Sequence, residues 1–599
     1  MSGSRAGTGT TSLGDQLVLV VASAALLLGT LATTLTGLAT ALGGAGWQPA
    51  PTGASILGLL NWPAHLTDPA SGYPAPARSR LPGAAAMWSA LGLLSLLLLA
   101  TAITGWRLSG SLRSRRPATA SDGRGLASRK ELTAHLGEKA VRARARQTRP
   151  SLTGRFPARE AGLSLGRELR SGLPLWGSVE DSYLILGPPR SGKGVHLVIP
   201  HTLDAPGAVL VTSTRPDTLH ATAASRAARG PVLAFDPQAL APDAPRLRWS
   251  PTRGCEDPLV AINRARALSA GANMTKGITS DGEFWQSMTA AVLRGYLHAA
   301  ALTGRPISDV LAWASRPSDP TPVRILRSES AAAGGWAEEL AAQAGADPRQ
   351  RDSVWSGVRR SIDSLADPRV LDACTPAVDS QFQPEQFLRE HGTVYLLGST
   401  GAQLSVAPLI TALLEDLLDT ARVLAAGSAH GRLDPPLLLL LDEAANIAPI
   451  PSLPNLLADG GGTGITTVAV LQSLAQARAR WGDAGADSMW DAATTKIVFG
   501  GLAHADDLHR ISRLAGDVDI PHVTHSRSSG GHSRSTSTQR QPALPLERIR
   551  CLPAGQALVL ARRCPPTQVR LTPWWQHSTQ GGLGRTSSPR KFLAGRGNR

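Results

Sequence analysis

Residues 182–199 of the chain read SYLILGPPRSGKGVHLVI, and this stretch decides the fold. The apolar run 182–186 has the length and composition of a buried strand, and an apolar helical start follows the glycine-rich segment. The segment between them fits the pattern G-x-x-x-x-G-K and consists of Gly187, Pro188, Pro189, Arg190, Ser191, Gly192, Lys193 and Gly194. In a strand–loop–helix context, this pattern predicts a loop whose backbone N–H groups and Lys193 bind phosphates.

We assign phosphate binding to these eight residues and to Val195, which begins the helix. In the usual form of the motif a Ser or Thr follows the lysine, and its hydroxyl binds Mg²⁺. Here that position is Gly194, so this ligand is absent. The sequence predicts ATP and Mg²⁺ as cofactors, with the metal held from elsewhere in the chain.

A second motif lies 249 residues after Lys193, where 436–443 read PLLLLLDE. Five consecutive leucines predict a parallel strand buried on both faces. Asp442 and Glu443 follow at its carboxyl end, the edge at which α/β sheets bind ligands. We expect Asp442 to hold Mg²⁺, with Glu443 beside it, and Glu443 to polarise the attacking water.

A third polar group follows another buried strand. The run 465–471 is apolar and ends in Gln472, and an amide at the tip of a strand beside the Asp-Glu strand can sense a nucleotide phosphate. We therefore predict catalytic roles for Lys193, Glu443 and Gln472. The alternative for Gln472 is an ordinary polar residue that ends a strand.

Alternating apolar runs and helical patterns between about 166 and 250 predict an α/β fold with a parallel sheet. Helical patterns replace them at 258–385, and strand signals return at 393–397, 436–441, 465–472 and 496–499, with a final pair at 556–561 and 567–571.

We divide the chain into a membrane anchor (1–106), a basic juxtamembrane linker with little core (107–165), two parts of a nucleotide-binding domain (166–257 and 386–575), an inserted all-α domain (258–385) and a basic disordered tail (576–599). The low-complexity segment 525–541 is expected to be a flexible loop, with a nucleic-acid contact as the alternative.

The anchor contains two long apolar runs without charged residues, about 17–43 and 83–106. Each exceeds the ~20 residues that cross ~30 Å of hydrocarbon, so we predict two transmembrane helices. Seven Arg and Lys residues follow the second run at 107–130, whereas the loop between the runs has only Arg78 and Arg80. The positive-inside rule then places both termini in the cytoplasm. Two core helices of a soluble protein are the alternative.

The formal net charge of +16 is confined to the flanks of the 599-residue chain. Residues 107–160 carry +10 and residues 576–599 carry +5, while 161–575 have no net charge. Only 6 of the 61 basic residues are Lys, which is typical of a GC-rich, actinobacterial-looking genome. The four cysteines are scattered without a C-x-x-C pair, which argues against a disulfide framework or a zinc site.

Taken together, these motifs resemble the type IV coupling proteins, the TraG/TraD-like ATPases of conjugation and type IV secretion. The residues that carry the resemblance are the paired apolar runs and the segments 187–200, 209–223, 437–465 and 470–482. Members of this family commonly have Gly after the phosphate-loop lysine, which accounts for Gly194. The resemblance implies a RecA-like P-loop NTPase domain with an all-α domain, anchored in the cytoplasmic membrane and assembled as a homo-hexamer. It implies a DNA translocase that delivers relaxase-bound single-stranded DNA to a type IV secretion channel.

The chain departs from some relatives just before the sensor strand. Where they have an Arg that could reach a neighbouring subunit's nucleotide, this chain has the glycine-rich segment 460–464. Four arginines remain as candidates for that role: Arg478, Arg480, Arg510 and Arg513. Two other functions stay open, an FtsK-like translocase of double-stranded DNA and a non-catalytic substrate receptor. The nature of the cargo, the cognate relaxase and the channel are not specified by the sequence.

Overall fold

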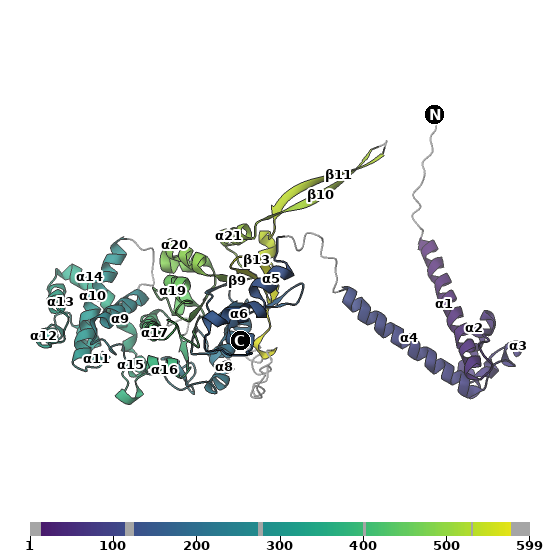
Figure 1. Cartoon of the computed structure of the whole chain (residues 1–599), viewed down its shortest axis with the longest axis horizontal. Helices are drawn as coiled ribbons and strands as arrows, with labels where there is room; N and C mark the ends of the chain where they lie inside the picture. The colour runs from purple at the N-terminus through teal and green to yellow at the C-terminus, as the bar shows by residue number, and fades with distance from the viewer. Residues whose placement is uncertain (1–12, 114–124, 273–279, 399–402, 529–530, 577–599) are drawn as a thin grey trace. The chain divides into compact units, whose positions relative to one another are not determined.

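The computed structural model describes residues 13–113, 125–272, 280–398, 403–528 and 531–576. These residues belong to two compact units, Met1–Asp122 and Gly123–Arg599 (Figure 1). The predicted basic tail lies almost entirely outside the described residues.

The first unit is built on two helices of 30 residues each, α1 (Leu13–Leu42) and α4 (Ala84–Arg113). Two short helices, α2 (Thr52–Asn61) and α3 (Ala75–Arg78), lie between them in the chain. Within the described part of the chain, one helical segment, Ala84–Thr104, is long and apolar enough to cross a membrane, and Leu26–Leu42 is a shorter apolar segment. Helices therefore occupy both predicted places, while a membrane crossing by α1 or by α4 stays a prediction.

The second unit contains an 11-stranded sheet with the order β2-β1-β13-β12-β9-β3-β8-β7-β4-β6-β5. The strands from β9 to β5 are parallel, and those from β2 to β12 pair antiparallel with their neighbours. Their bounds are β1 Gly162–Glu168, β2 Pro174–Ser178, β3 Tyr183–Leu186, β4 Val209–Ser213, β5 Val232–Phe235, β6 Thr393–Leu397, β7 Leu437–Leu441, β8 Ile465–Leu471, β9 Thr495–Phe499, β12 Gln556–Ala561 and β13 Cys564–Arg570. The predicted α/β fold is confirmed, and β3 to β9 lie where the sequence predicts strands.

Side chains of the parallel strands alternate between two cores, one on each face of the sheet. In β7, Leu437, Leu439 and Leu441 belong to one core, while Leu438 and Leu440 belong to the other. All five are buried, so this strand is covered on both faces, as the leucine run predicts.

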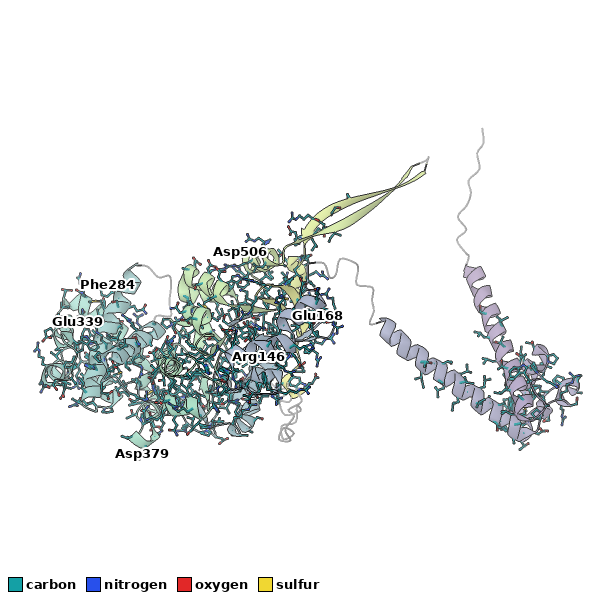
Figure 2. The ribbon with its side chains drawn as sticks, in the orientation of Figure 1. Arg146, Glu168, Phe284, Glu339, Asp379 and Asp506 are labelled. Carbon is teal, nitrogen blue, oxygen red and sulfur yellow. The ribbon has the colours of Figure 1, made fainter. Side chains whose placement is uncertain are left out.

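The helices of this unit form two groups: some flank the sheet, and the others lie between β5 and β6 in the chain. The flanking helices are α5 Arg129–Leu136, α6 Glu138–Thr148, α7 Ile199–Asp204, α8 Asp217–Ala227, α17 Gln403–Ala426, α18 Ala444–Ile447, α19 Leu453–Asp459, α20 Leu474–Ala492, α21 Ala505–Ala515 and α22 Leu546–Arg550. Between β5 and β6 the described elements are all helical: α9 Pro258–Ala272, α10 Ser280–Leu302, α11 Ile307–Ser315, α12 Thr321–Ser328, α13 Trp336–Ala344, α14 Pro348–Ile362, α15 Pro368–Ala373 and α16 Pro384–Arg389. Figure 2 labels Phe284 and Glu339 within this helical region and Glu168 at the antiparallel end of the sheet.

Residues 125–165 differ from the predicted linker with little core. Ser128 and Glu131 form a capping box that starts α5, and α5 buries Leu132 and Leu136 against the sheet. Beyond α6, Arg149 is buried and its Nε lies 2.6 Å from Asp434 Oδ1. The helical pattern at about 129–146 predicts a helix there, and α5 and α6 occupy that stretch. Their packing against the sheet depends on residues far away in the chain, so the polar composition of the segment did not reveal its core.

The segment 525–541 also differs from the flexible loop that its composition predicts. β10 (Asp517–Ser528) and β11 (Gly531–Pro542) pair in antiparallel register as a separate two-stranded sheet. An antiparallel ladder is held by backbone hydrogen bonds, and Thr favours extended backbone, so a hairpin forms without an apolar pattern.

The amino ends of the parallel strands meet in close backbone contacts. A Cβ on Gly461, before β8, would collide with the carbonyl oxygen of Glu180, before β3. A Cβ on Gly207, before β4, would collide with the carbonyl oxygen of Pro436, before β7. Arg226 of α8 is fully buried at this edge and donates to the carbonyl oxygens of Ala205 and Gly207, each at 2.7 Å.

Candidate nucleotide site

The predicted phosphate loop connects β3 to a helix at the carboxyl edge of the sheet. The helix begins with a π-helical turn, Gly194–Val198, and continues as α7. Two loop residues have left-handed backbone, Arg190 with φ 64° and Gly192 with φ 95°. A Cβ on Gly192 would lie 2.9 Å from the Cδ2 atom of His196, whereas one on Gly194 would meet nothing within 4 Å. Glycine is thus required at 192, and the space at 194 is open.

Lys193 is buried inside the loop that it is predicted to serve. Its Nζ donates to the carbonyl oxygens of Gly187 at 2.6 Å and Pro188 at 3.1 Å. Burial lowers the pKa of Lys193, and the carboxylates of Asp442 and Glu443 oppose that shift. The ammonium group is therefore held near both acidic residues, at the point where a phosphate would meet it.

The remaining loop residues differ in exposure. Pro189 and Arg190 are exposed, while Val195 lies half-buried in the first helical turn. Within the described part of the chain, the buried Ser191 Oγ has no hydrogen-bond partner. A buried hydroxyl without a partner is unfavourable, so a ligand that supplies an acceptor would fit beside it.

Asp442 directly follows β7 and carries an unsatisfied carboxylate oxygen. Its Oδ1 is buried and has no hydrogen-bond partner within the described residues, although the residue as a whole is half-buried. Its main-chain carbonyl accepts from Thr212 Oγ1 at 2.7 Å, which ties it to β4. Burial raises the pKa of Asp442 to about 6, Glu443 adds to the shift, and Lys193 opposes it. A buried oxygen with an open coordination position fits a cation.

Glu443 has a left-handed backbone, with φ 56°, and precedes α18. Gln472, at the end of β8, donates through Nε2 to both carboxylate oxygens of Glu443, each at 2.9 Å. Asn446 Nδ2 lies 3.3 Å from Glu443 Oε2. Because β8 lies between β3 and β7, it carries the Gln472 amide to a position between the phosphate loop and the acidic pair.

The structure therefore brings the predicted residues of three strands to one edge. The contact between Gln472 and Glu443 could not be read from the sequence, since strand order is needed to place them together. Thr212 and Asn446 were also missed. Both lie in segments that carry the family resemblance, 209–223 and 437–465, but no motif in the sequence assigns either residue a role.

The four candidate arginines have different surroundings. Arg478 lies 3.5 Å from Asp507, and Arg510 lies 2.6 Å from Asp487. Burial lowers the pKa of Arg480 to about 10. Arg513 is exposed at the end of α21 and forms no ion pair within the described part of the chain. No contact among the described residues selects one of them as the residue that reaches a neighbouring nucleotide.

Comparison with protein families gives a match in the second half of the chain. Residues 436–554 match the family described as the TraM recognition site of TraD and TraG. This segment includes Asp442, Glu443 and Gln472.

Two curated relatives match different lengths of the chain. Protein VirD4 of Agrobacterium fabrum is 24% identical over 404 residues, which are 65% of this chain and 58% of that protein. Conjugal transfer protein TraG of Rhizobium radiobacter is 29% identical over 154 residues, 25% of this chain and 23% of the relative. The chain thus spans less than two thirds of the length of these relatives.

Solved structures with a similar fold are those of the coupling protein TrwB. An unbound form has a TM-score of 0.52 at 19% identity and covers 68% of this chain and 88% of its own. A complex with a non-hydrolysable ATP analogue has a TM-score of 0.51 at 18% identity and covers 72% of this chain and 92% of its own. At these identities the likeness establishes the fold. The comparisons confirm the resemblance to type IV coupling proteins that the motifs carry.

Proposed function

Given this likeness to the coupling proteins, we propose that the chain is a membrane-anchored ATPase that drives DNA into a type IV secretion channel. The observation that carries the proposal is the meeting of Lys193, Asp442, Glu443 and Gln472 at one edge of the sheet. The TrwB structures similar to this chain include complexes with an ATP analogue and with ADP and Mg²⁺, which supports the same cofactors here.

In this proposal each residue has one task. The loop 187–195 and Lys193 hold the phosphates, and Asp442 holds Mg²⁺ through its unpartnered Oδ1. The metal, when bound, supplies positive charge that neutralises charge on the phosphates. Glu443 accepts a proton from the attacking water, and the Gln472 amide keeps its carboxylate in one orientation.

The anchor and the assembly belong to the same proposal. α1 and α4 cross the cytoplasmic membrane with both termini inside, because the basic residues follow the second helix. The helical region after β5 acts as a separate all-α domain, and the active form is a homo-hexamer. Its partners are relaxase-bound single-stranded DNA and the channel proteins.

The test is ATP hydrolysis by the full chain in lipid vesicles, with and without single-stranded DNA. Lys193→Ala should weaken nucleotide binding, whereas Glu443→Gln should preserve binding and reduce hydrolysis by about 10²–10⁴-fold, as expected for loss of a general base. Lys139→Ala, which removes an exposed lysine on α6, is the matched control. Hydrolysis at the wild-type rate by either site variant would contradict the proposed roles.

The same assay, together with a measurement of conjugative transfer, separates the alternative functions. Stimulation by single-stranded DNA that falls steeply with salt supports a translocase that contacts phosphates. Stimulation by double-stranded DNA alone would support the FtsK-like alternative. A chain that supports conjugative transfer despite Lys193→Ala would act as a non-catalytic receptor.

A further inference from the structure

The two long helices of the first unit are covered along only part of their length. α4 is exposed from residue 95 to residue 104, with Leu96 at 68% and Leu99 at 61% exposure. Towards its start, Met87 and Ala90 are buried in a core that also contains Leu35 and Ala39 of α1. This packed core therefore occupies the end of α4 that is far from the basic linker.

The uncovered part of α4 is too short to cross a bilayer alone. The first charged residue after the apolar run is Arg107, so the apolar sequence from residue 95 onward, 95–106, is twelve residues long. Twelve helical residues span about 18 Å, at about 1.5 Å each, whereas the hydrocarbon core is about 30 Å thick. A crossing by α4 must therefore include residues back to about Met87, together with the core around them.

α2 reaches deeper than this core. A Cβ on Gly29 of α1 would lie 2.9 Å from Thr52 Cγ2 and 3.8 Å from Ile56 Cδ1, so the first turn of α2 lies beside Gly29. Gly29 precedes Leu35 by six residues, about 9 Å along the helix. Since Leu35 shares the core with Met87, the start of α2 lies about 9 Å further into the hydrocarbon.

The non-helical backbone that leads into α2 is satisfied by side chains of α1. Thr40 Oγ1 accepts from the Gln48 N–H, and Thr36 Oγ1 accepts from the Ala50 N–H, each at 3.1 Å. Ser55 Oγ donates to the Ala50 carbonyl at 3.0 Å. Both threonines are fully buried. Irregular backbone is tolerated at membrane depth only where protein groups satisfy it, and these contacts satisfy the Gln48 N–H and both backbone groups of Ala50.

The outer face of α2 exposes two leucines. Leu57 is 54% exposed and Leu60 is 67% exposed, while Ser55 and Gly58 on the opposite face are buried. Charged residues lie elsewhere in this unit, where Arg78 and Asp68 form an exposed pair at 3.9 Å. The unit therefore has an apolar face on α2 and a polar end near α3.

We propose that residues 47–61 form a re-entrant segment, in which α2 enters the leaflet opposite the basic linker and presents Leu57 and Leu60 to lipid acyl chains. This inference rests on the proposed crossing of the membrane by α1 and α4. The segment between the two crossings is then partly embedded in the membrane, and only its polar end, near Arg78, lies in water.

The test measures the depth of single residues in the full chain, reconstituted in vesicles of phosphatidylcholine and phosphatidylglycerol. Cys551 is the exposed cysteine of the four and is replaced by Ser, while Cys255, Cys374 and Cys564 are buried. Nitroxide labels are placed at Leu57→Cys and Leu60→Cys. Leu97→Cys, on uncovered α4, reports hydrocarbon, and Ser79→Cys, exposed near α3, reports water.

The readout is the ratio of collision rates with oxygen and with a water-soluble nickel chelate. We expect the ratio at 57 and 60 to resemble that at 97 and to exceed that at 79 several-fold. If the labels at 57 and 60 behave like the label at 79 while the label at 97 lies in hydrocarbon, the re-entrant segment is wrong and the proposed membrane crossing stands. Labels shielded from both reagents would place a second copy of the chain on α2 and overturn the lipid assignment. If 97 also meets the nickel chelate, the proposed crossing fails and the inference fails with it.

Discussion

The amide of Gln472 is the group that fixes the orientation of Glu443 in the candidate site. It donates to both carboxylate oxygens at 2.9 Å, so its removal frees the carboxylate to rotate. We expect Gln472→Ala to reduce the rate of ATP hydrolysis by about 10–100-fold, the usual cost of a misplaced catalytic group. Nucleotide affinity should change little, because the phosphates are held by the loop.

The measurement is kcat together with the affinity for a fluorescent ATP analogue. Gln386→Ala removes an exposed amide on α16 and serves as the control. An unchanged kcat for Gln472→Ala would mean that Glu443 needs no such positioning.

Asp442 links the site to the stability of the empty protein. Burial raises its pKa to about 6, so ionising it costs folding free energy as the pH rises from about 4 to 6. Above pH 6 that cost is fully present. Asp442→Asn should therefore stabilise the nucleotide-free chain at pH 7.5, by on the order of 1–3 kcal/mol at about 1.4 kcal/mol per pKa unit.

Thermal unfolding at several pH values checks this prediction. The difference between the variant and the wild type should disappear near pH 4, where Asp442 is protonated. The same variant should lose Mg²⁺-dependent nucleotide binding, since its side chain has lost the charge. If Asp442→Asn is less stable than the wild type at pH 7.5, ionisation of Asp442 does not destabilise the empty protein.

At the scale of elements, one buried ion pair connects α9 to α17. Arg264 Nη2 lies 2.6 Å from Asp416 Oδ1, and Trp249 Nε1 donates to Asp416 Oδ2 at 2.8 Å. Arg264 is 3% exposed, so loss of Asp416 leaves a buried guanidinium without its partner. We expect Asp416→Ala to lower the free energy of unfolding by about 3–5 kcal/mol.

Denaturant unfolding measures that loss, and two further variants interpret it. Asp309→Ala breaks a partly exposed pair between Arg305, which precedes α11, and Asp309 in its first turn, and should cost less than about 1 kcal/mol. The double variant Arg264→Met/Asp416→Leu should recover most of the stability, because neither buried charge remains. Equal effects of Asp416→Ala and Asp309→Ala would argue against a structural role for the buried pair.

Elements with a strong periodic pattern could be predicted from the sequence, and others could not. The leucine run 437–441 and the phosphate loop have patterns that few other structures produce. β1 was missed because glycine and polar residues interrupt its apolar positions, and its burial depends on pairing with β2 and β13. The hairpin 517–542 was missed because backbone pairing with no apolar pattern is invisible to a reading based on hydrophobicity.

At the scale of the whole molecule, basic charge and motor chemistry occupy different parts of the chain. The segment 107–160, with a net charge of +10, begins in the last turns of α4 and continues beyond it, whereas 161–575, which holds the site, is neutral. The residues of the site could be predicted from the sequence, since Asp442, Glu443 and Gln472 directly follow recognisable strands and Lys193 lies in a recognisable motif. Its internal contacts could not, because the order β3-β8-β7 follows from packing across nearly 300 residues.

The two edges of the parallel sheet differ in a way that affects its motions. At the amino edge, Gly207 and Gly461 lie in close contact with neighbouring backbone, and the buried Arg226 donates hydrogen bonds to backbone carbonyl oxygens. At the carboxyl edge lie a glycine-containing loop and the side chains that would meet the nucleotide. Amide protons at the amino edge should therefore exchange with deuterium slowly, with or without nucleotide. On ATP binding, the protection of amide protons should change at 187–195 and 442–447. The amino edge of the sheet then stays rigid while its carboxyl edge changes with the nucleotide. Equal changes in protection at both edges, measured by mass spectrometry, would contradict this.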